Sequence, residues 1–375
     1  MKLLLLTVLA SWTILLGKHI AGGDEPFPRE ITFYVYVVYD AFIHVGFRER
    51  HHPPLYAATF FNSVNLMLQR MSTPKIRFEV LRVNHKNVPK AEDLLYLDFG
   101  EVNAHKSLDK IVKESTPTKS EFKGVDIIFF MCGRKVFTSG DTGKKDYHPQ
   151  GLTFERGICT DTKSIVIVHD DGKHFTGLPN AGFQLARLLG APTRCTPEYY
   201  KLASNDVLFP HNDCPFNEIK NFLCTLDPEI KSSCFQNYRL PTQFQLFIGT
   251  LPIDVTSEHN FCDATSAPDK LYGITRLQRC NETHFGNQTW NEAEWDAIPD
   301  LKNAMFKGLN REELRRPCTF VCCNGRWQDT WKKAGYGTFY KMYYSFDGTP
   351  CGDMTDEICV LGECVKKTSQ LLGQN

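Results

Sequence analysis

The spacing of apolar residues predicts alternating strands and helices in the first part of this 375-residue chain. Residues 31–39 form a nearly continuous run of β-branched and aromatic side chains, which is typical of a buried central strand. Residues 53–71 follow a helical spacing that begins at two prolines and places four apolar side chains on one face: Phe60, Val64, Met67 and Met71. Residues 76–80 alternate between apolar and polar, as in a half-buried strand.

The same alternation continues toward the middle of the chain. Residues 103–114 predict a polar helix, and residues 125–131 and 165–168 predict two further apolar strands. Residues 133–157 are rich in Gly, Lys and Thr, and they predict a surface loop between those two strands. A chain that alternates strands and helices in this way is expected to form an α/β domain.

Two more helices are predicted after the last of these strands. Residues 180–190 carry Leu185, Leu188 and Leu189 on one face, as expected of a helix packed under a sheet. Residues 214–224 form an amphipathic helix with a proline in its first turn. Beyond residue 227 the alternation ends and cysteines crowd toward the C-terminus, so we expect the stability of that part to depend on crosslinks.

The net charge and the N-terminal segment indicate which partners are excluded and that the protein is exported. The 43 Lys and Arg residues balance 43 Asp and Glu residues, which argues against a nucleic acid or a membrane surface bound through net charge. Lys2, the apolar run 3–16 and the small residues 21–23 predict a secretory signal peptide, because the run is too short for a membrane anchor. The sequons at Asn281 and Asn287 predict N-glycans.

The cysteine count also fits a secreted protein. Fourteen cysteines in an oxidising compartment are expected to form seven disulfides, whose pairing the sequence leaves open. The fourteen are Cys132, Cys159, Cys195, Cys214, Cys224, Cys234, Cys262, Cys280, Cys318, Cys322, Cys323, Cys351, Cys359 and Cys364.

Residues 180–194 contain the most informative motif, and they read Asn-Ala-Gly-Phe-Gln-Leu-Ala-Arg-Leu-Leu-Gly-Ala-Pro-Thr-Arg. This stretch resembles the zinc-binding helix of metzincin proteases, H-E-x-x-H-x-x-G-x-x-H, in which three His bind zinc and Glu acts as the base. The resemblance places the zinc ligands at Phe183, Arg187 and Thr193, and the base at Gln184. Gly190 keeps the glycine of the turn, and Arg194 stands where the family usually has Asp.

The replacements remove the chemistry of such a site. Zinc needs lone pairs from N, S or O atoms at about 2.0–2.3 Å, and Phe183 has none. Arg187 offers only N–H donors and carries a fixed positive charge, which repels a divalent cation. Thr193 is a weak neutral ligand, and Gln184 cannot accept a proton from water. We therefore expect neither a zinc cofactor nor catalysis.

Other segments extend the resemblance to the reprolysin (adamalysin) branch of the metzincins, and most closely to the secreted salivary metalloproteases of ticks. Residues 159–172 resemble the strand and turn before the zinc helix, and residues 214–223 resemble the C-terminal helix of the protease domain. Residues 347–352, with Cys359 and residues 361–365, resemble the cysteine-rich module that follows it.

The chain also departs from the family outside the motif. Leu208, within residues 206–209, stands where the family has the Met of its Met-turn. The first predicted strand follows the signal peptide closely, which leaves no room for the family's inhibitory pro-segment. The cysteines between residues 234 and 318 are too sparse for a disintegrin module, and Ser139-Gly140-Asp141 does not replace an Arg-Gly-Asp.

Three further groups of residues were weighed as sites. His169 and His174 flank an acidic turn and could form a displaced metal site, although loop histidines explain them more simply. Cys318, Cys322 and Cys323 fit disulfides better than zinc, and His51-His52 fits a solvated loop. Arg187 and Arg194 could bind an anion or carboxylate, or Arg187 could instead pair with Asp170, Asp171 or Asp206 and plug the cleft.

The sequence thus predicts an α/β (α+β) metzincin-like domain with a mixed twisted sheet and long helices, followed by a disulfide-rich irregular domain. The expected boundaries are 1–22 for the signal peptide, 27–228 for the reprolysin-like domain and 229–375 for the cysteine-rich domain. We expect a secreted, monomeric, glycosylated pseudoprotease that binds extracellular proteins, such as host haemostatic or matrix proteins. The alternatives are an active zinc metalloendopeptidase with an atypical metal site and an inert decoy antigen.

Overall fold

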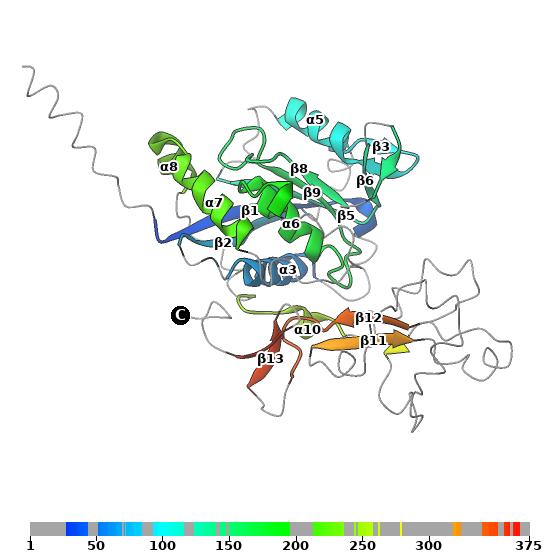
Figure 1. Cartoon of the computed structure of the whole chain (residues 1–375). Coiled ribbons are helices and arrows are strands. Elements are labelled where there is room, and N and C mark those ends of the chain that lie inside the picture. The colour runs from blue at the N-terminus through cyan, green and yellow to red at the C-terminus, as the bar shows by residue number, and fades with distance from the viewer. Residues whose placement is uncertain are drawn as a thin grey trace, which may run out of the picture.

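The centre of the fold is a five-stranded mixed sheet with the strand order β2-β1-β5-β9-β8 (Figure 1). Strands β1 (Glu30–Tyr39), β2 (Lys75–Asn84), β5 (Ile127–Cys132) and β9 (Ile165–His169) are parallel, and the edge strand β8 (Gly151–Thr153) is antiparallel. The sequence predicts all four parallel strands, three from apolar runs and β2 from its alternating pattern. The mixed sheet and its helices confirm the predicted α/β class.

The structure is a computed structural model of the chain. It describes residues 28–43, 52–69, 71, 73–84, 93–115, 124–139, 143–147, 150–195, 213–235, 244, 247–257, 262, 278–279, 318–323, 340–351, 356–360 and 363–367.

Both faces of the sheet are covered, which explains the continuous apolar run of β1. Alternate β1 residues from Ile31 to Tyr39 lie in the larger core with helices α3 (Pro53–Leu68), α6 (Leu178–Leu188) and α7 (Cys214–Thr225). Tyr36 and Val38 face the opposite core, under α5. A strand buried on both faces reads as apolar throughout, because neither set of alternate side chains meets water.

The helices follow the predicted segments closely. Helix α5 spans Ala104–Ser115, and its polar pattern fits a helix that covers one side of the sheet. Helix α3 ends at Leu68, so Met71, which is buried, lies beyond the helix and not in it. Helix α8 (Pro228–Cys234) starts at the predicted domain boundary. Its Cys234 is bonded to Cys159 and lies in the larger core. Packing with the first domain therefore continues past residue 228.

The surface loop predicted for residues 133–157 is wrong, because three short strands lie within it. Strands β6 (Val136–Ser139) and β7 (Lys145–Asp146) form a small sheet with β3 (Leu97–Asp98) and β4 (Glu101–Asn103), in the order β3-β4-β6-β7. Strand β8 completes the main sheet. Strands of two to four residues are too short to show a periodicity among Gly, Lys and Thr.

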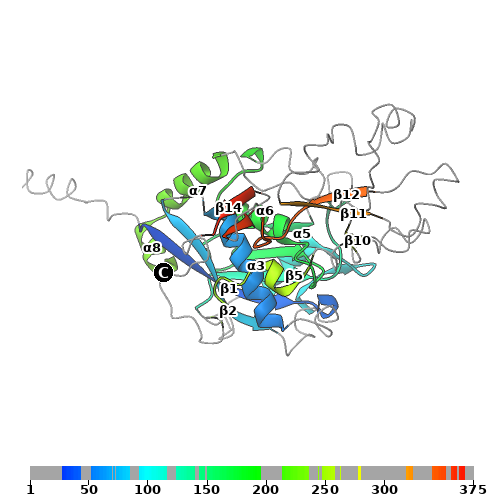
Figure 2. The same cartoon turned by 90° about the horizontal axis from the view of Figure 1, so that it is seen from below.

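Helix α3 is buried on two sides, between the main sheet and the C-terminal region. Helix α10 (Pro252–Val255) lies next to it (Figures 1 and 2). The Asn62 side chain donates hydrogen bonds to the carbonyl oxygens of Phe247 and Thr250, both at 2.9 Å. Leu66 packs with three apolar residues of the C-terminal region: Leu251, Ile358 and Val360. The first and last thirds of the chain are therefore joined by direct contacts.

The C-terminal region consists of short antiparallel strands. Strands β10 (Gln278–Arg279), β11 (Thr319–Cys323) and β12 (Tyr340–Tyr344) form one sheet. Strands β13 (Glu357–Val360) and β14 (Glu363–Lys366) form a hairpin. Two disulfides crosslink this region, Cys318–Cys359 and Cys351–Cys364, as expected for a segment with a small apolar core.

The expectation that all fourteen cysteines form disulfides is wrong at two positions. In the part of the chain that the structure describes, Cys132 and Cys224 are free. Cys132 ends a central strand, where burial encloses its thiol and raises its pKa well above the usual value. Cys224 lies exposed on α7. The two remaining described disulfides are Cys159–Cys234 and Cys195–Cys214, and Cys262 is also bonded.

None of the described helices is long and apolar enough to cross a membrane. The predicted signal peptide and the sequons at Asn281 and Asn287 lie outside the described residues, as do His51, Cys280 and residues 206–209.

Asp126, just before β5, gives the fold a predicted pH dependence. Its carboxylate accepts a hydrogen bond from the Tyr34 backbone N–H at 2.7 Å, and burial raises its pKa from 3.8 to about 7. Since the folded pKa lies above the unfolded one, the folded state binds the proton more tightly. We expect the free energy of unfolding to fall as the pH rises from about 4 to about 7. Urea unfolding of the wild type and Asp126→Asn over this pH range would check this, because the slope should be smaller in the variant.

Candidate functional site

The site predicted from the sequence lies on helix α6 and the turn after it. The helix starts after Gly177, with Pro179 in its first turn, and ends at Leu188. Leu185, Leu188 and Leu189 are all fully buried against the sheet, as predicted. Helix α6 contacts both β8 and β9, so the candidate positions lie next to the edge strand of the sheet.

The residues at the three ligand positions do not fit zinc. Phe183 is fully buried in the larger core, so its ring serves packing and supplies no lone pair. The Arg187 guanidinium lies 5.8 Å from the centre of that ring, which brings a fixed positive charge beside the first position. Thr193 opens the short 3-10 helix η2 (Thr193–Cys195) and offers at most a neutral hydroxyl. A divalent cation at this place would meet a guanidinium instead of imidazole nitrogens.

Gln184, at the position of the base, connects the helix to the edge strand. It is fully buried, and its Nε2 donates a hydrogen bond to the Gly151 carbonyl at 3.0 Å. Its Oε1 has no hydrogen-bond partner among the described residues. An amide has no proton-accepting group of useful pKa, so Gln184 can position β8 and cannot act as a general base.

Arg187 pairs with an acid that the sequence did not single out. Its Nη2 lies 3.6 Å from the Glu155 carboxylate, and its Nε is buried without a hydrogen-bond partner among the described residues. The Arg187 carbonyl accepts hydrogen bonds from the N–H groups of Arg156 and Gly190, at 3.0 and 2.9 Å. Among the described residues, Arg187 thus pairs with Glu155 and not with Asp170 or Asp171, and the blocking of a cleft stays a prediction.

The turn after α6 is fixed by close packing. Gly190 has a φ of +108°, and a Cβ there would lie 2.6 Å from the Cβ of Phe222 on α7. Arg194 forms an ion pair with Glu218, also on α7, and its side chain is 73% exposed. Arg187 and Arg194 therefore each contact a different carboxylate. These contacts do not direct the two guanidinium groups toward one shared anion, and a joint anion site stays a prediction.

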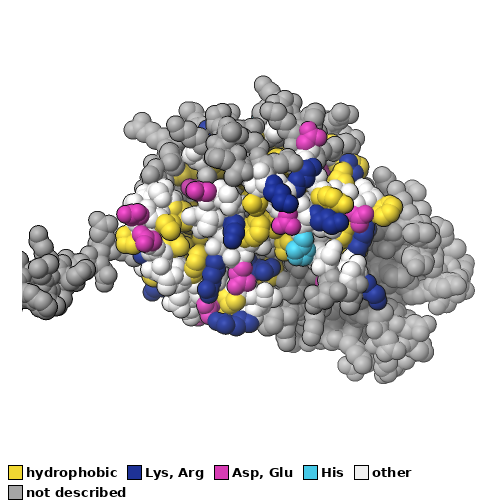
Figure 3. All heavy atoms as spheres, turned by 90° about the horizontal axis from the view of Figure 1, so that it is seen from above, with side chains coloured by type: hydrophobic (Ala, Val, Ile, Leu, Met, Phe, Trp, Pro, Cys, Tyr) yellow, Lys and Arg dark blue, Asp and Glu magenta, His cyan; other side chains and the backbone are white. Residues whose placement is uncertain are grey.

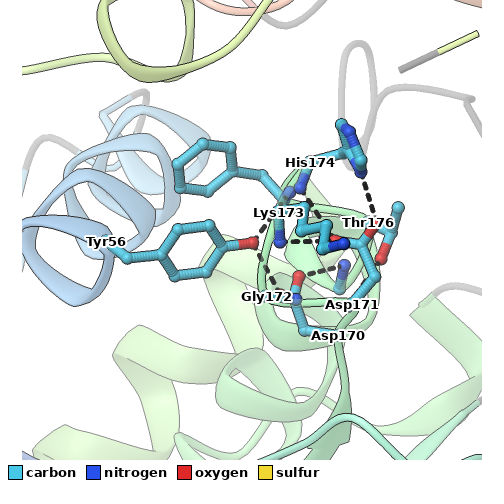
Figure 4. A network of polar contacts seen from close by, with 9 residues as sticks. Tyr56, Asp170, Asp171, Gly172, Lys173, His174 and Thr176 are labelled. Carbon is cyan, nitrogen blue, oxygen red and sulfur yellow. Dashed lines mark hydrogen bonds and ion pairs between the residues drawn. The ribbon is translucent and has the colours of Figure 1, made fainter. Parts of the chain in front are cut away.

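The acidic turn before α6 forms a buried hydrogen-bond network with α3 (Figure 4). Asp170 is fully buried and accepts hydrogen bonds from Tyr56 Oη at 2.6 Å, Gly172 N at 2.7 Å and Gly177 N at 2.8 Å. Tyr56 Oη in turn accepts one from Phe175 N at 2.9 Å, and the two rings stack with their centres 4.2 Å apart. The network fixes the turn that leads into the candidate helix.

Burial and the neighbouring charges shift the pKa values of the two adjacent acids in opposite directions. Burial, together with the charge of Asp171, raises the pKa of Asp170 to about 6. Burial also opposes ionisation of Asp171, but the hydrogen bond and charge of His174 outweigh it and hold the pKa of Asp171 below its usual value. The Asp171 carboxylate lies 2.6 Å from His174 Nδ1.

The structure does not bring His169 and His174 together as metal ligands. His169 Nδ1 lies 3.0 Å from the Cys132 carbonyl and 2.8 Å from the Arg134 carbonyl, whereas His174 contacts Asp171. Among the described residues, one group of potential ligands is close enough to hold an ion: Cys318, Cys351 and Cys364. All three are in disulfides, so they have no thiolate to offer a metal.

Comparisons with known proteins give only distant similarities. No family model matches the sequence, and no curated protein matches it. One similar solved structure is metalloproteinase-II from Bacteroides fragilis, with 13% identity and a TM-score of 0.31, covering 53% of this chain and 59% of that chain. Another, titled a chaperone-substrate complex, has 13% identity and a TM-score of 0.29, covering 43% of this chain and 24% of that one. The matches span less than two thirds of either neighbour, and at these TM-scores neither assigns a family.

Proposed function

We propose that this protein is a secreted, catalytically inactive relative of the reprolysin-type metalloproteases, and that it acts by binding extracellular proteins. The observation that carries the proposal is the ion pair between Arg187 of α6 and Glu155, which follows β8. A guanidinium held at the second ligand position by a carboxylate excludes a divalent cation by charge. The disulfides of the chain are consistent with an oxidising, extracellular environment.

The other motif positions support the same proposal. Hydrolysis of a peptide bond by this class of site needs a polarised water and a base to accept its proton. Phe183 is used in the core and Gln184 is used to hold β8, so neither can supply these functions. What remains is a folded scaffold with accessible surfaces, and binding is the activity that such a scaffold can perform.

Metal analysis and protease assays test the absence of catalysis. We expect the purified full chain to carry no stoichiometric zinc, to bind none in a titration, and to cleave none of gelatin, casein or fibrinogen. The same assays after incubation with zinc salts exclude loss of metal during purification. Cleavage that a chelator abolishes would overturn the proposal and favour the atypical metalloendopeptidase.

The role of the Arg187–Glu155 ion pair can be tested by exchanging the charges of the two residues. Arg187→Glu should lower the free energy of unfolding by about 1 kcal/mol, because it replaces a partly exposed ion pair with two like charges. The double variant Glu155→Arg with Arg187→Glu should recover part of the loss, since the pair is restored in reverse. Urea unfolding measures both. Equal losses in the single and the double variant would mean that the pair does not hold Arg187 in place.

A further inference from the structure

Large apolar side chains are exposed around one hairpin of the small sheet, on the carboxyl side of the main strands. Phe99 is 97% exposed, Phe42 is 51% exposed, and Tyr96 and Leu97 are also exposed. Phe99 and Gly100 form the two-residue turn between β3 and β4. Single exposed apolar residues are ordinary on protein surfaces, but a group of them next to one turn indicates a contact surface.

The backbone conformation of Phe99 is unfavourable for a phenylalanine, and the exposure of its ring is unfavourable for solubility. Phe99 has a φ of +51° and Gly100 a φ of +84°, so both central residues of the turn are left-handed. Such turns favour Asn, Asp or Gly, and a Phe there is strained. A strained aromatic residue whose side chain touches almost nothing in its own protein is best explained by something that it contacts outside.

The hairpin that presents Phe99 is held rigidly. Arg134 Nη1 donates a hydrogen bond to the Gly100 carbonyl at 3.1 Å. Lys145 Nζ lies 2.9 Å from the Glu101 carboxylate and 3.4 Å from that of Asp98. A single lysine of β7 thus bridges the two carboxylates on either side of the turn and offsets one of their two charges. Little conformational entropy would be lost when this tip makes a contact.

Cations lie against the aromatic rings of this surface. The Arg134 guanidinium is 3.9 Å from the centre of the Phe42 ring, and Lys145 Nζ is 5.7 Å from that of Phe99. Lys106 Nζ is 4.5 Å from the ring of Tyr96 on the same side of the molecule. On the face seen from above, Lys and Arg side chains lie among hydrophobic and acidic ones (Figure 3). Interleaved aromatic and cationic side chains are the composition of surfaces that lie in the headgroup layer of a bilayer.

We propose that the hairpin patch, defined as Phe42, Leu97, Phe99, Arg134 and Lys145, contacts the interfacial layer of a lipid bilayer that contains anionic lipids. The tip of the hairpin is convex, so the Phe99 side chain can enter a lipid layer without other parts of this protein beside it. The polar groups of Asp98, Glu101 and Gly100 already contact Lys145 and Arg134, which leaves few directional groups to fix the orientation of a protein partner. A fluid interface requires no such orientation, whereas a protein pocket does.

The proposal concerns a reversible surface contact and not an anchor. Few aromatic side chains with nearby cations give weak binding that depends on anionic lipid, because each cation near the surface adds a small electrostatic attraction. The balanced charge of the whole chain does not oppose this, since only charges within about 10 Å of the surface act on it. The contact would concentrate the protein at cell surfaces, independently of whether the α6 site is catalytic.

Sedimentation with vesicles tests the proposal. The probes are vesicles of phosphatidylcholine alone and of phosphatidylcholine with phosphatidylserine, mixed with the full disulfide-bonded protein. Phe99→Asn removes the ring while suiting the left-handed turn, so the hairpin should fold as well as in the wild type. Ile230→Gln is the matched control, because Ile230 on α8 is exposed but lies outside the patch.

We expect the wild type and Ile230→Gln to sediment with phosphatidylserine vesicles and less with phosphatidylcholine alone, and Phe99→Asn to bind about tenfold more weakly. Absence of wild-type binding, or equal binding by Phe99→Asn, would overturn the proposal. If Phe99→Asn instead lost binding to a protein ligand while the wild type ignored both vesicles, the tip would be assigned to a protein pocket. Circular dichroism of each variant would verify that its fold is intact.

Discussion

Replacing Asp170 with alanine is expected to lower the free energy of unfolding by about 3 kcal/mol, one of the two largest effects predicted for this chain. The substitution leaves three donors without their acceptor: Tyr56 Oη, Gly172 N and Gly177 N. All of them are buried, so water cannot replace the carboxylate without opening the turn. Urea unfolding of the two proteins at pH 7 measures the difference.

The pH dependence of this effect separates the buried carboxylate from simple loss of packing. The folded pKa of Asp170, about 6, lies above the usual 3.8, so the folded state binds the proton more tightly than the unfolded state. The wild type therefore loses stability through this group as the pH rises from about 4 to about 6, and the slope over that range should be smaller in Asp170→Ala. The difference between them should be larger at pH 4 than at pH 7. Asp126 contributes its own slope from about pH 4 to about 7 in both proteins, so that contribution cancels in their difference.

Asp161→Ala is the matched control for Asp170→Ala. Asp161 is exposed in the turn before β9, so its loss should change the free energy of unfolding by less than about 0.5 kcal/mol. If Asp170→Ala destabilised the protein no more than Asp161→Ala, the network would not hold α3 to the turn before α6. Tyr56→Phe should show a smaller loss than Asp170→Ala, because it removes one hydroxyl from the same network.

The central strands and the α6 helix could be predicted because their burial appears directly in the sequence. Residues 31–39 are apolar throughout since both faces of β1 are covered, and Leu185, Leu188 and Leu189 follow the period of a helix. The short strands β6, β7 and β8 could not be predicted, because two to four residues show no period. Their place is set by pairing with other strands: β6 with β4, which is distant in the chain, β7 with β6, and β8 with β9.

The candidate site was predictable in its residues and not in its contacts. The chemistry of Phe183, Gln184 and Arg187 follows from their side chains alone, whatever the fold. The partner of Arg187 does not, because Glu155 reaches it only after β8 has joined the sheet. The Tyr56–Asp170 hydrogen bond spans 114 positions, and no local pattern in α3 distinguishes that tyrosine from a core residue. The sequence thus defines the chemistry of these side chains, and tertiary packing determines their contacts.

Gly190→Ala is expected to lower the free energy of unfolding by about 3 kcal/mol, because it combines backbone strain with a collision. The new Cβ would lie 2.6 Å from the Cβ of Phe222, close to a backbone that cannot rotate away. The φ of +108° adds strain for any residue other than glycine. Thermal and urea unfolding of the variant measure the sum of the two effects.

Gly143→Ala separates these two contributions. Gly143 has a φ of +71°, and a Cβ there would meet no atom within 4 Å, so its replacement measures backbone strain without a collision. We expect a loss of about 1 kcal/mol at Gly143, and the excess at Gly190 is then the cost of separating α6 from α7. Equal losses of unfolding free energy at the two positions would show that α7 moves to accommodate a methyl group at Gly190. In that case only the backbone conformation would hold the turn after α6. The position of α6 against the sheet would then depend on the hydrogen bonds of Asp170 and Gln184.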